Sequence, residues 1–231
     1  MQEWIFARIS DDRLGMKPMK DSSFAKLVVL VNGLVPLAML SWDGAHHRLG
    51  ANPTAFITHT TGTLALIFLI ASLAMTPLRK LSGSNYFSHF RKLLGLVGFF
   101  YVFLHLLTYL SFDRAGQLRT VPADIVKRPF ILVGMLAFLM LIPLAATSTS
   151  GAIKRLGAKR WKQLHRLAYI AAILGVVHYY LLVKADTSKP IAYGSVLAVL
   201  LLLRLLRKPL FPHSPARRDP RFQSSPGGSA A

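Results

Sequence analysis

Residues 93–112 read LLGLVGFFYVFLHLLTYLSF, a run of 20 residues with no charged side chain and one histidine, His105. A helix of about 20 apolar residues is long enough to cross the hydrocarbon core of a membrane. The run lacks the alternation of apolar and polar residues that is typical of a strand in a membrane barrel. It therefore predicts a transmembrane helix.

Five further runs share this apolar character, and they lie at 27–42, 54–75, 130–147, 164–183 and 191–206. The 231-residue chain is 53% hydrophobic and carries a formal net charge of +19. That combination excludes a disordered chain and disfavours a soluble globule. We predict an all-α membrane protein with a bundle of six transmembrane helices in one domain at 22–206. Residues 1–21 are predicted to form a cytoplasmic segment, and residues 207–231 a disordered basic cytoplasmic tail.

Lysine and arginine are distributed unevenly between the segments that join the six predicted spans. With a cytoplasmic N-terminus, 21 of the 28 lie in cytoplasmic segments and seven lie outside. Because cytoplasmic loops carry an excess of these residues, we predict an N-in, C-in topology. The loops at 43–53, 113–128 and 184–190 would then face the periplasm and dock a partner. Topology and contact with anionic membrane lipids explain the positive charge, so no nucleic-acid partner is expected.

The acidic residues and the lack of cysteine exclude several classes of protein. None of the nine Asp and Glu residues lies within a predicted span, whereas an ion-coupled transporter usually keeps a carboxylate near the middle of the membrane. A transporter is therefore a disfavoured alternative. The chain contains no cysteine, which excludes a thiolate nucleophile, an iron–sulfur cluster and a thiolate-ligated haem.

Four of the eight histidines lie within the predicted spans or at their ends, namely His59, His105, His165 and His178. Two neutral imidazoles on facing helices can bind one haem iron without adding charge to the membrane. In the predicted topology, His105 and His178 lie at similar depth in the outer half, on two helices that run in the same direction. We predict that they bind one haem as a pair.

His165 is a candidate for a second, inner redox site. It precedes His178 by 13 residues, which is about 20 Å along a helix at about 1.5 Å per residue. An ideal helix places these two rings on nearly opposite faces, so a π-bulge or a rotated bundle would be needed to bring both inside. The inner site has no obvious second histidine. Arg91 stands fourteen residues before His105, and the nearest histidine is His89.

His59 lies near the outer end of the second predicted span. Four interpretations stay open for it. It could be a third imidazole of the outer cluster, an alternative haem ligand, part of a quinone site, or a packing histidine that is hydrogen-bonded to Thr60 or Thr61.

Several short motifs carry a resemblance to a known family. The stretch KRWKQLHRLAY at 159–169, followed by HYY at 178–180 and Lys184, resembles the MsrQ family, the haem-binding membrane subunits of the bacterial periplasmic methionine-sulfoxide reductase system. Further similar pieces are THTTG at 58–62, TPL at 76–78, RKLLGL at 91–96, LHL at 104–106, RPF at 128–130 and TST at 147–149. The similarity extends over about residues 27–207, and this family belongs to the wider ferric-reductase-like transmembrane group.

The resemblance implies six helices, one or two b-type haems and a location in the bacterial inner membrane. It also implies electron flow from the quinone pool to a periplasmic molybdopterin enzyme that reduces methionine sulfoxide in proteins, with catalysis in that partner. The family is associated with FMN, although the sequence contains no recognisable FMN motif. By position, the family's haem histidines correspond to His105, His165 and His178.

The main alternative function is a haem-containing ferric or other transmembrane reductase. Such an enzyme needs a cytosolic flavin and nicotinamide domain, and the 25 residues after Leu206 are too few to form one. We therefore expect that a separate flavin reductase would have to supply the electrons in that case.

Overall fold

The computed structural model describes residues 21–114, 116–183 and 185–205. The predicted cytoplasmic segment at 1–21, apart from its last residue, and the predicted tail at 207–231 lie outside the described residues. Within the described ranges the chain is helical and contains no strand. The expected all-α architecture is therefore confirmed for this part of the molecule.

The six long helices follow the six apolar runs of the sequence. They are α2 (Asp21–Ala45), α3 (Pro53–Ser82), α4 (Ser88–Thr108), α6 (Pro129–Ala146), α9 (Leu167–Leu182) and α10 (Ser188–Leu205). Five stretches of the described residues are long and apolar enough to cross a membrane, and they contain α2, α3, α4, α6 and α9. The chain is thus a multi-pass membrane protein. Because α10 is not among these five, a sixth crossing stays a prediction.

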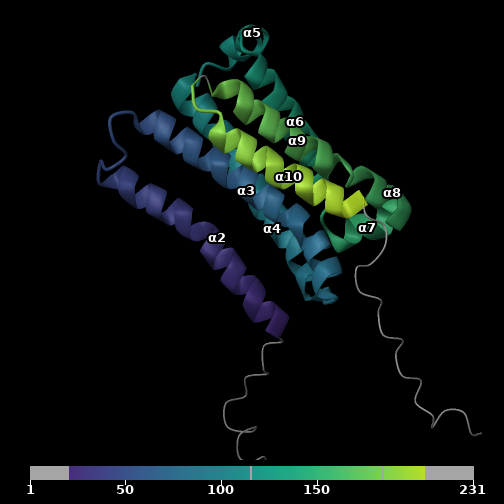
Figure 1. Ribbon diagram of the computed structural model, residues 1–231. Helices are drawn as coiled ribbons and strands as arrows, with labels where there is room; N and C mark the ends of the chain where they lie inside the picture. The colour runs from purple at the N-terminus through teal and green to yellow at the C-terminus, as the bar shows by residue number, and fades with distance from the viewer. Residues whose placement is uncertain (1–20, 115, 184, 206–231) are drawn as a thin grey trace, which may run out of the picture.

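Short helices fill the connections at both ends of the bundle. They are the 3₁₀ turns η1 (Asn85–Phe87) and η3 (Leu118–Thr120), the π-helical turn η2 (Tyr109–Asp113), and the α-helices α5 (Val121–Lys127), α7 (Ser150–Leu156) and α8 (Ala158–Leu164). The predicted loop at 113–128 is therefore partly helical, and α5 projects from one end of the bundle in Figure 1.

Helices α3, α4, α6 and α9 form the centre of the bundle, with α10 packed beside α9 and α3 (Figure 1). Helix α2 lies at the edge, and only 6% of its apolar stretch is buried. Its main attachment is at Gly33, whose carbonyl accepts a hydrogen bond of 2.7 Å from the hydroxyl of Tyr101. Tyr101 is fully buried, so this bond satisfies a hydroxyl group that water cannot reach.

The N-terminal turns of α3 and α6 are fixed by local sequence. Helix α3 begins at Pro53, and the side chain of Asn52 caps it by accepting a hydrogen bond of 3.0 Å from the amide of Ala55. Helix α6 begins at Pro129, a residue whose fixed φ suits the first helical position. These two turns lie at the same end of the bundle as the C-terminal ends of α4 and α9, because adjacent helices run in opposite directions.

The fifth predicted span is not one continuous helix. The amide of His165 still bonds to the Trp161 carbonyl at 3.0 Å, but the amide of Arg166 bonds to Gln163, only three residues back, at 3.1 Å. This tighter turn ends α8 at Leu164, and α9 begins at Leu167. His165 thus lies before the first residue of α9, so the geometry of one ideal helix does not apply between it and His178. The π-helical turn occurs instead in η2, shortly after His105.

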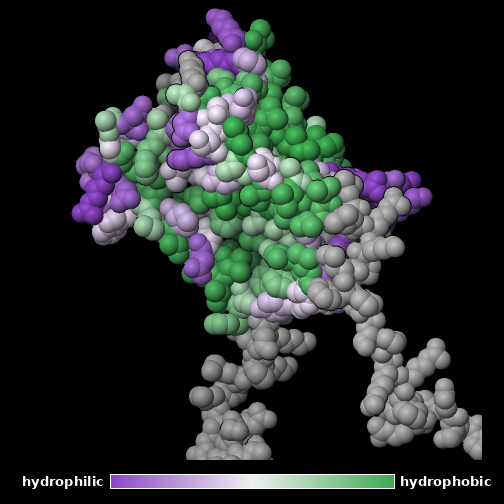
Figure 2. Space-filling view, in the orientation of Figure 1, coloured by the Kyte–Doolittle hydropathy of each residue, from purple (hydrophilic) through white to green (hydrophobic). Residues whose placement is uncertain are grey.

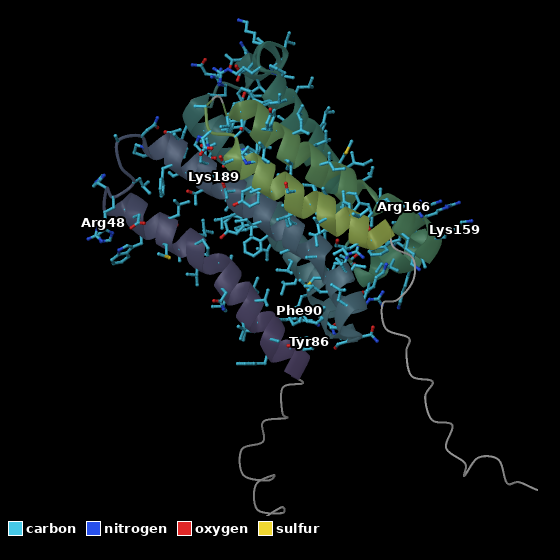
Figure 3. All side chains as sticks on the ribbon, in the orientation of Figure 1. Arg48, Tyr86, Phe90, Lys159, Arg166 and Lys189 are labelled. Atoms are coloured by element: carbon cyan, nitrogen blue, oxygen red, sulfur yellow. The ribbon has the colours of Figure 1, made fainter. Side chains whose placement is uncertain are left out.

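The surface has the character expected in a membrane. Figure 2 shows apolar residues over the middle of the visible face and hydrophilic residues gathered on the loops at its ends. Large apolar side chains such as Leu27, Leu139 and Leu202 are exposed. In Figure 3, Arg48 and Lys189 lie toward one end of the bundle, and Lys159 and Arg166 lie toward the other.

Candidate haem-binding site

His105 and His178 meet in the centre of the four-helix core. Their ring centroids are 6.0 Å apart and the ring planes make an angle of 83°. Both rings line a cavity of about 190 Å³ whose lining residues come mainly from α3, α4, α6 and α9. The pair that the sequence predicted from matched depth is therefore brought together by the fold.

Each of these histidines is held through Nδ1 by a backbone carbonyl. Nδ1 of His105 lies 2.9 Å from the carbonyl oxygen of Thr58 on α3. Nδ1 of His178 lies 2.6 Å from the carbonyl oxygen of Phe130 on α6. A carbonyl can only accept, so Nδ1 must donate its proton in both rings. The lone pair of each Nε2 is left available for a metal ion.

A glycine makes room for each ring. A Cβ atom added to Gly62 would lie 3.0 Å from Nδ1 and Cε1 of His105. A Cβ atom added to Gly134 would lie 2.7 Å from Nδ1 of His178. Gly62 follows Thr58 by four residues, and Gly134 follows Phe130 by four, so each helix presents its carbonyl and its glycine on one face. A carbonyl and a glycine four residues apart on one helix thus support each of the two histidines.

The geometry and lining of this cavity fit a haem. Two imidazoles that bind one metal ion through Nε2 at about 2 Å have ring centroids about 6 Å apart, which agrees with the observed 6.0 Å. The described residues contain no group of three or more His, Asp or Glu that could hold a bare metal ion. A haem needs only two axial ligands, because its macrocycle supplies the others. The apolar lining includes Leu66, Leu69, Val102, Ile131, Phe138 and Leu141.

His59 also lines the outer cavity, but its side chain is exposed. The proposed packing partner Thr61 is almost fully buried and uses its hydroxyl within α3, where it donates to the carbonyl oxygens of Ile57 at 2.8 Å and Thr58 at 3.1 Å. The oxygen of this hydroxyl keeps its capacity to accept a hydrogen bond, so all four interpretations of His59 stay predictions.

His165 lies at the opposite end of the bundle and is held differently. Its ring stacks on the indole of Trp161, with centroids 3.9 Å apart and an interplanar angle of 28°. Its Nε2 lies 3.2 Å from the hydroxyl oxygen of Thr147. That hydroxyl donates its one proton to the carbonyl oxygen of Pro143 at 2.6 Å. We infer that Nε2 of His165 carries a proton and donates to Thr147, so the nitrogen that is left available in His105 and His178 is occupied here.

A second cavity, of about 640 Å³, opens beside His165. Four basic side chains line it, and no acidic side chain is among its lining residues; the basic residues are Arg79, Arg91, Lys92 and Arg204. The fold therefore brings Arg91 to the same cavity as His165. His89 does not line this cavity, and its exposed ring contacts the carbonyl of Tyr86 through Nδ1 at 3.3 Å.

Sequence reasoning missed several of the residues that make these two sites. The carbonyls of Thr58 and Phe130 gave no signal, because every residue has a carbonyl. Gly62 and Gly134 were visible as small residues within spans, but their contacts with the histidine rings depend on how the helices pair. Trp161 was visible as an aromatic residue near His165, four positions away on one helix face.

Comparison with known proteins first defines the class. Residues 61–176 match the family described as the ferric reductase like transmembrane component. The match includes His105 and His165 and ends two residues before His178. The chain thus belongs to the class of ferric-reductase-like transmembrane proteins.

Three similar relatives narrow this class of membrane proteins to one family. Each is named as the heme-binding subunit MsrQ of a protein-methionine-sulfoxide reductase. The protein from Herminiimonas arsenicoxydans is 48% identical over 182 residues, which cover 78% of this chain and 84% of the relative. The protein from Rhodospirillum rubrum is 50% identical, with 78% and 87% covered, and that from Ralstonia nicotianae is 45% identical, with 82% and 88% covered. The chain belongs to the MsrQ family, and the resemblance predicted from its motifs is confirmed.

Proposed function

We propose that the chain is a b-type membrane cytochrome that passes electrons from the respiratory quinone pool to a periplasmic molybdopterin methionine-sulfoxide reductase. The observation that carries this proposal is the paired geometry of His105 and His178, each with Nδ1 tied to a carbonyl and Nε2 available. The relatives support it, since they are named heme-binding subunits of a methionine-sulfoxide reductase.

The donor set of the chain favours a non-covalently bound haem. Covalent attachment of a c-type haem requires cysteine, and the sequence has none. His105 and His178 would hold the iron through Nε2, and the carbonyls of Thr58 and Phe130 would fix both rings and increase the basicity of the ligating nitrogens. When bound, the haem supplies the one-electron chemistry. The mainly apolar lining of the cavity suits the apolar faces of a macrocycle.

The inner cavity is our proposed entry point for electrons. Its four cations would attract an anionic or phosphate-bearing electron carrier, such as FMN, and its stacked Trp161 and His165 offer a flat face to a quinone ring. A second haem with His165 as ligand would need another nitrogen of the ring, or loss of the bond to Thr147. The arrangement therefore favours a hydrogen-bonding role for His165 over a second bis-histidine haem.

We propose the N-in, C-in topology in the bacterial inner membrane, with the outer histidine pair near the periplasmic face. The loops at 43–53, 113–128 and 184–190 would then lie on the side where the partner docks. Reporter fusions at Gly116 and at Gly157 test this orientation. They should report the periplasm and the cytoplasm respectively, and two cytoplasmic signals would contradict the topology.

Reconstitution of the full chain in proteoliposomes tests the proposed function. The purified protein should show a Soret band and a low-spin spectrum, and a quinol should reduce it. Addition of the molybdopterin partner and an oxidised protein substrate should reoxidise the haem, and omission of the partner is the control. A preparation that never binds haem would overturn the proposal.

The same experiment separates the second candidate function. The match to the ferric reductase like family favours testing a separate flavin reductase as electron donor. Reduction by NADH with that enzyme, together with no reduction by quinol, would favour a flavin-fed transmembrane reductase over a quinol-fed subunit.

A further inference from the structure

Asp124 is the only buried acidic side chain among those whose burial the structure describes, with 6% of its surface exposed. It lies on α5, within the loop that we predict to be periplasmic. A buried carboxylate is retained only where several donors compensate for the loss of water. No pattern in the sequence distinguishes Asp124 from the other loop carboxylates, so its contacts need an explanation.

Three side chains from separate parts of the loop converge on this carboxylate. The hydroxyl of Tyr109 donates to Oδ2 at 2.7 Å. Nε of Arg128 lies 3.1 Å from Oδ1, and Nη1 of Arg114 lies 3.6 Å from the same oxygen. The guanidinium of Arg114 also lies 5.9 Å from the centroid of the Tyr109 ring.

These contacts join the two chain segments that lead to the histidine pair. Tyr109 follows His105 by four residues, lines the same cavity and begins the π-helical turn η2. Arg128 ends α5 and stands two residues before Phe130, whose carbonyl holds His178. Asp124 therefore connects the helix that carries one histidine to the turn that orients the other.

The bond between Tyr109 and Asp124 also holds the start of the π-helical turn η2. π-helical turns are rare, and they occur frequently at functional sites. Here the amide of Arg114 bonds to the carbonyl of Tyr109 at 3.1 Å, five residues back. The Tyr109–Asp124 bond fixes the first residue of that turn, directly after the end of α4 at Thr108.

We propose that Asp124 is a positioning residue that sets the relative orientation of His105 and His178 by holding both segments at the mouth of the cavity. This inference rests on the proposed haem ligation by the pair. Asp124 touches neither ring. It acts through Tyr109 on the α4 side and through Arg128 on the α6 side.

The test compares variants of the full chain purified with haem. Asp124→Asn keeps the shape and an acceptor for Tyr109 but removes the charge that holds the arginines. Tyr109→Phe removes only the hydroxyl that donates to Asp124. Asp186→Asn is the matched control, because Asp186 is an exposed carboxylate of another outer-end loop that bonds to the amide of Ser188. The readouts are the rate of haem transfer to excess apomyoglobin and the low-spin EPR signal, which reports the angle between the two imidazole planes.

We expect Asp124→Asn to release haem about tenfold faster, as for other residues that orient metal ligands, and to shift the EPR signal. Tyr109→Phe should shift the signal in the same direction by less, and Asp186→Asn should match the wild type. A wild-type EPR signal and release rate in Asp124→Asn would overturn the inference. If Asp124→Asn fails to fold, an unshifted signal in Tyr109→Phe would overturn it instead. Failure of the proposed function is distinguishable, because the wild-type protein itself would then lack a bis-histidine signal.

Discussion

The two ends of the bundle, which the proposed topology makes the outer and the inner end, use the same residue type in two different ways. At the outer end, His105 and His178 are tied through Nδ1 to main-chain carbonyls in an apolar cavity. At the inner end, His165 is tied through Nε2 to a side-chain hydroxyl beside a cavity lined by four cations. Because the nitrogen that is tied decides which nitrogen is available, the outer pair presents Nε2 to a metal ion, whereas the inner histidine is left with the lone pair of Nδ1, a hydrogen-bond acceptor.

The largest expected effect is loss of the outer pair. Replacement of His105 or His178 by Ala should abolish most of the haem absorbance, because each removes one of only two axial ligands. His89→Ala is the control, since His89 is exposed and lines neither cavity. Spectra of the purified proteins give the result. A full low-spin spectrum in either outer variant would show that another residue, such as His59, binds the iron.

The next largest effect should come from the glycines that support the outer rings. Gly134→Ala places a Cβ atom 2.7 Å from Nδ1 of His178, closer than the 3.0 Å of Gly62→Ala at His105. Either ring would have to move off its carbonyl, at a cost of about 1–3 kcal/mol for overpacking. We expect haem affinity to fall about 10- to 100-fold in Gly134→Ala, with a smaller loss in Gly62→Ala, as measured by haem titration.

Gly175→Ala is a matched control for these two variants. Gly175 lines the same cavity, but an added Cβ atom would meet only Leu66 Cδ1 at 3.4 Å, an ordinary contact. If Gly175→Ala loses as much haem as Gly134→Ala, then cavity volume, and not the position of the histidine ring, explains the loss.

Loss of the inner histidine should have the opposite signature. His165→Ala should keep the outer haem spectrum and yet be reduced more slowly by quinol. A hydrogen bond between His165 and a charged electron carrier would contribute about 1.5–3 kcal/mol, and its loss corresponds to roughly 10- to 100-fold in rate. Stopped-flow reduction measures this difference. A wild-type rate in His165→Ala would mean that electrons enter elsewhere, and His59 at the outer cavity would be the next residue to replace.

The sequence predicted the outer site more completely than the inner one. Apolar runs, and the position of a histidine within a run, are visible in the linear sequence. The helices and the pairing of His105 with His178 were therefore predictable. The supports of that pair were not, because the carbonyls of Thr58 and Phe130 become specific only when α3 meets α4 and α6 meets α9.

The inner site depends on the break between α8 and α9, for which the sequence contains no signal. The stretch WKQLHRLAY at 161–169 contains neither glycine nor proline, so nothing in it predicts that α8 ends at Leu164. The contacts that accompany the break are tertiary. The indole of Trp161 donates to the carbonyl of Thr147 at 2.9 Å, and His165 meets the hydroxyl of the same residue. Thr147, at the C-terminal end of α6, thus holds the turn between α8 and α9. No pattern within 161–169 could have predicted these contacts with another helix.

The smallest expected effect tests which nitrogen of His165 is tied. Thr147→Val removes the hydroxyl that accepts from Nε2 and keeps the backbone carbonyl that holds Trp161, so the ring stack should persist. One hydrogen bond contributes about 1 kcal/mol, or roughly fivefold in a rate. We expect quinol reduction in Thr147→Val to slow by no more than that, with an unchanged outer haem spectrum. Thr147→Ser retains the hydroxyl and should react at the wild-type rate. If Thr147→Val instead gained a second low-spin haem signal, then release of Nε2 would have created an iron ligand, and the difference between the two ends would lie in this single hydrogen bond.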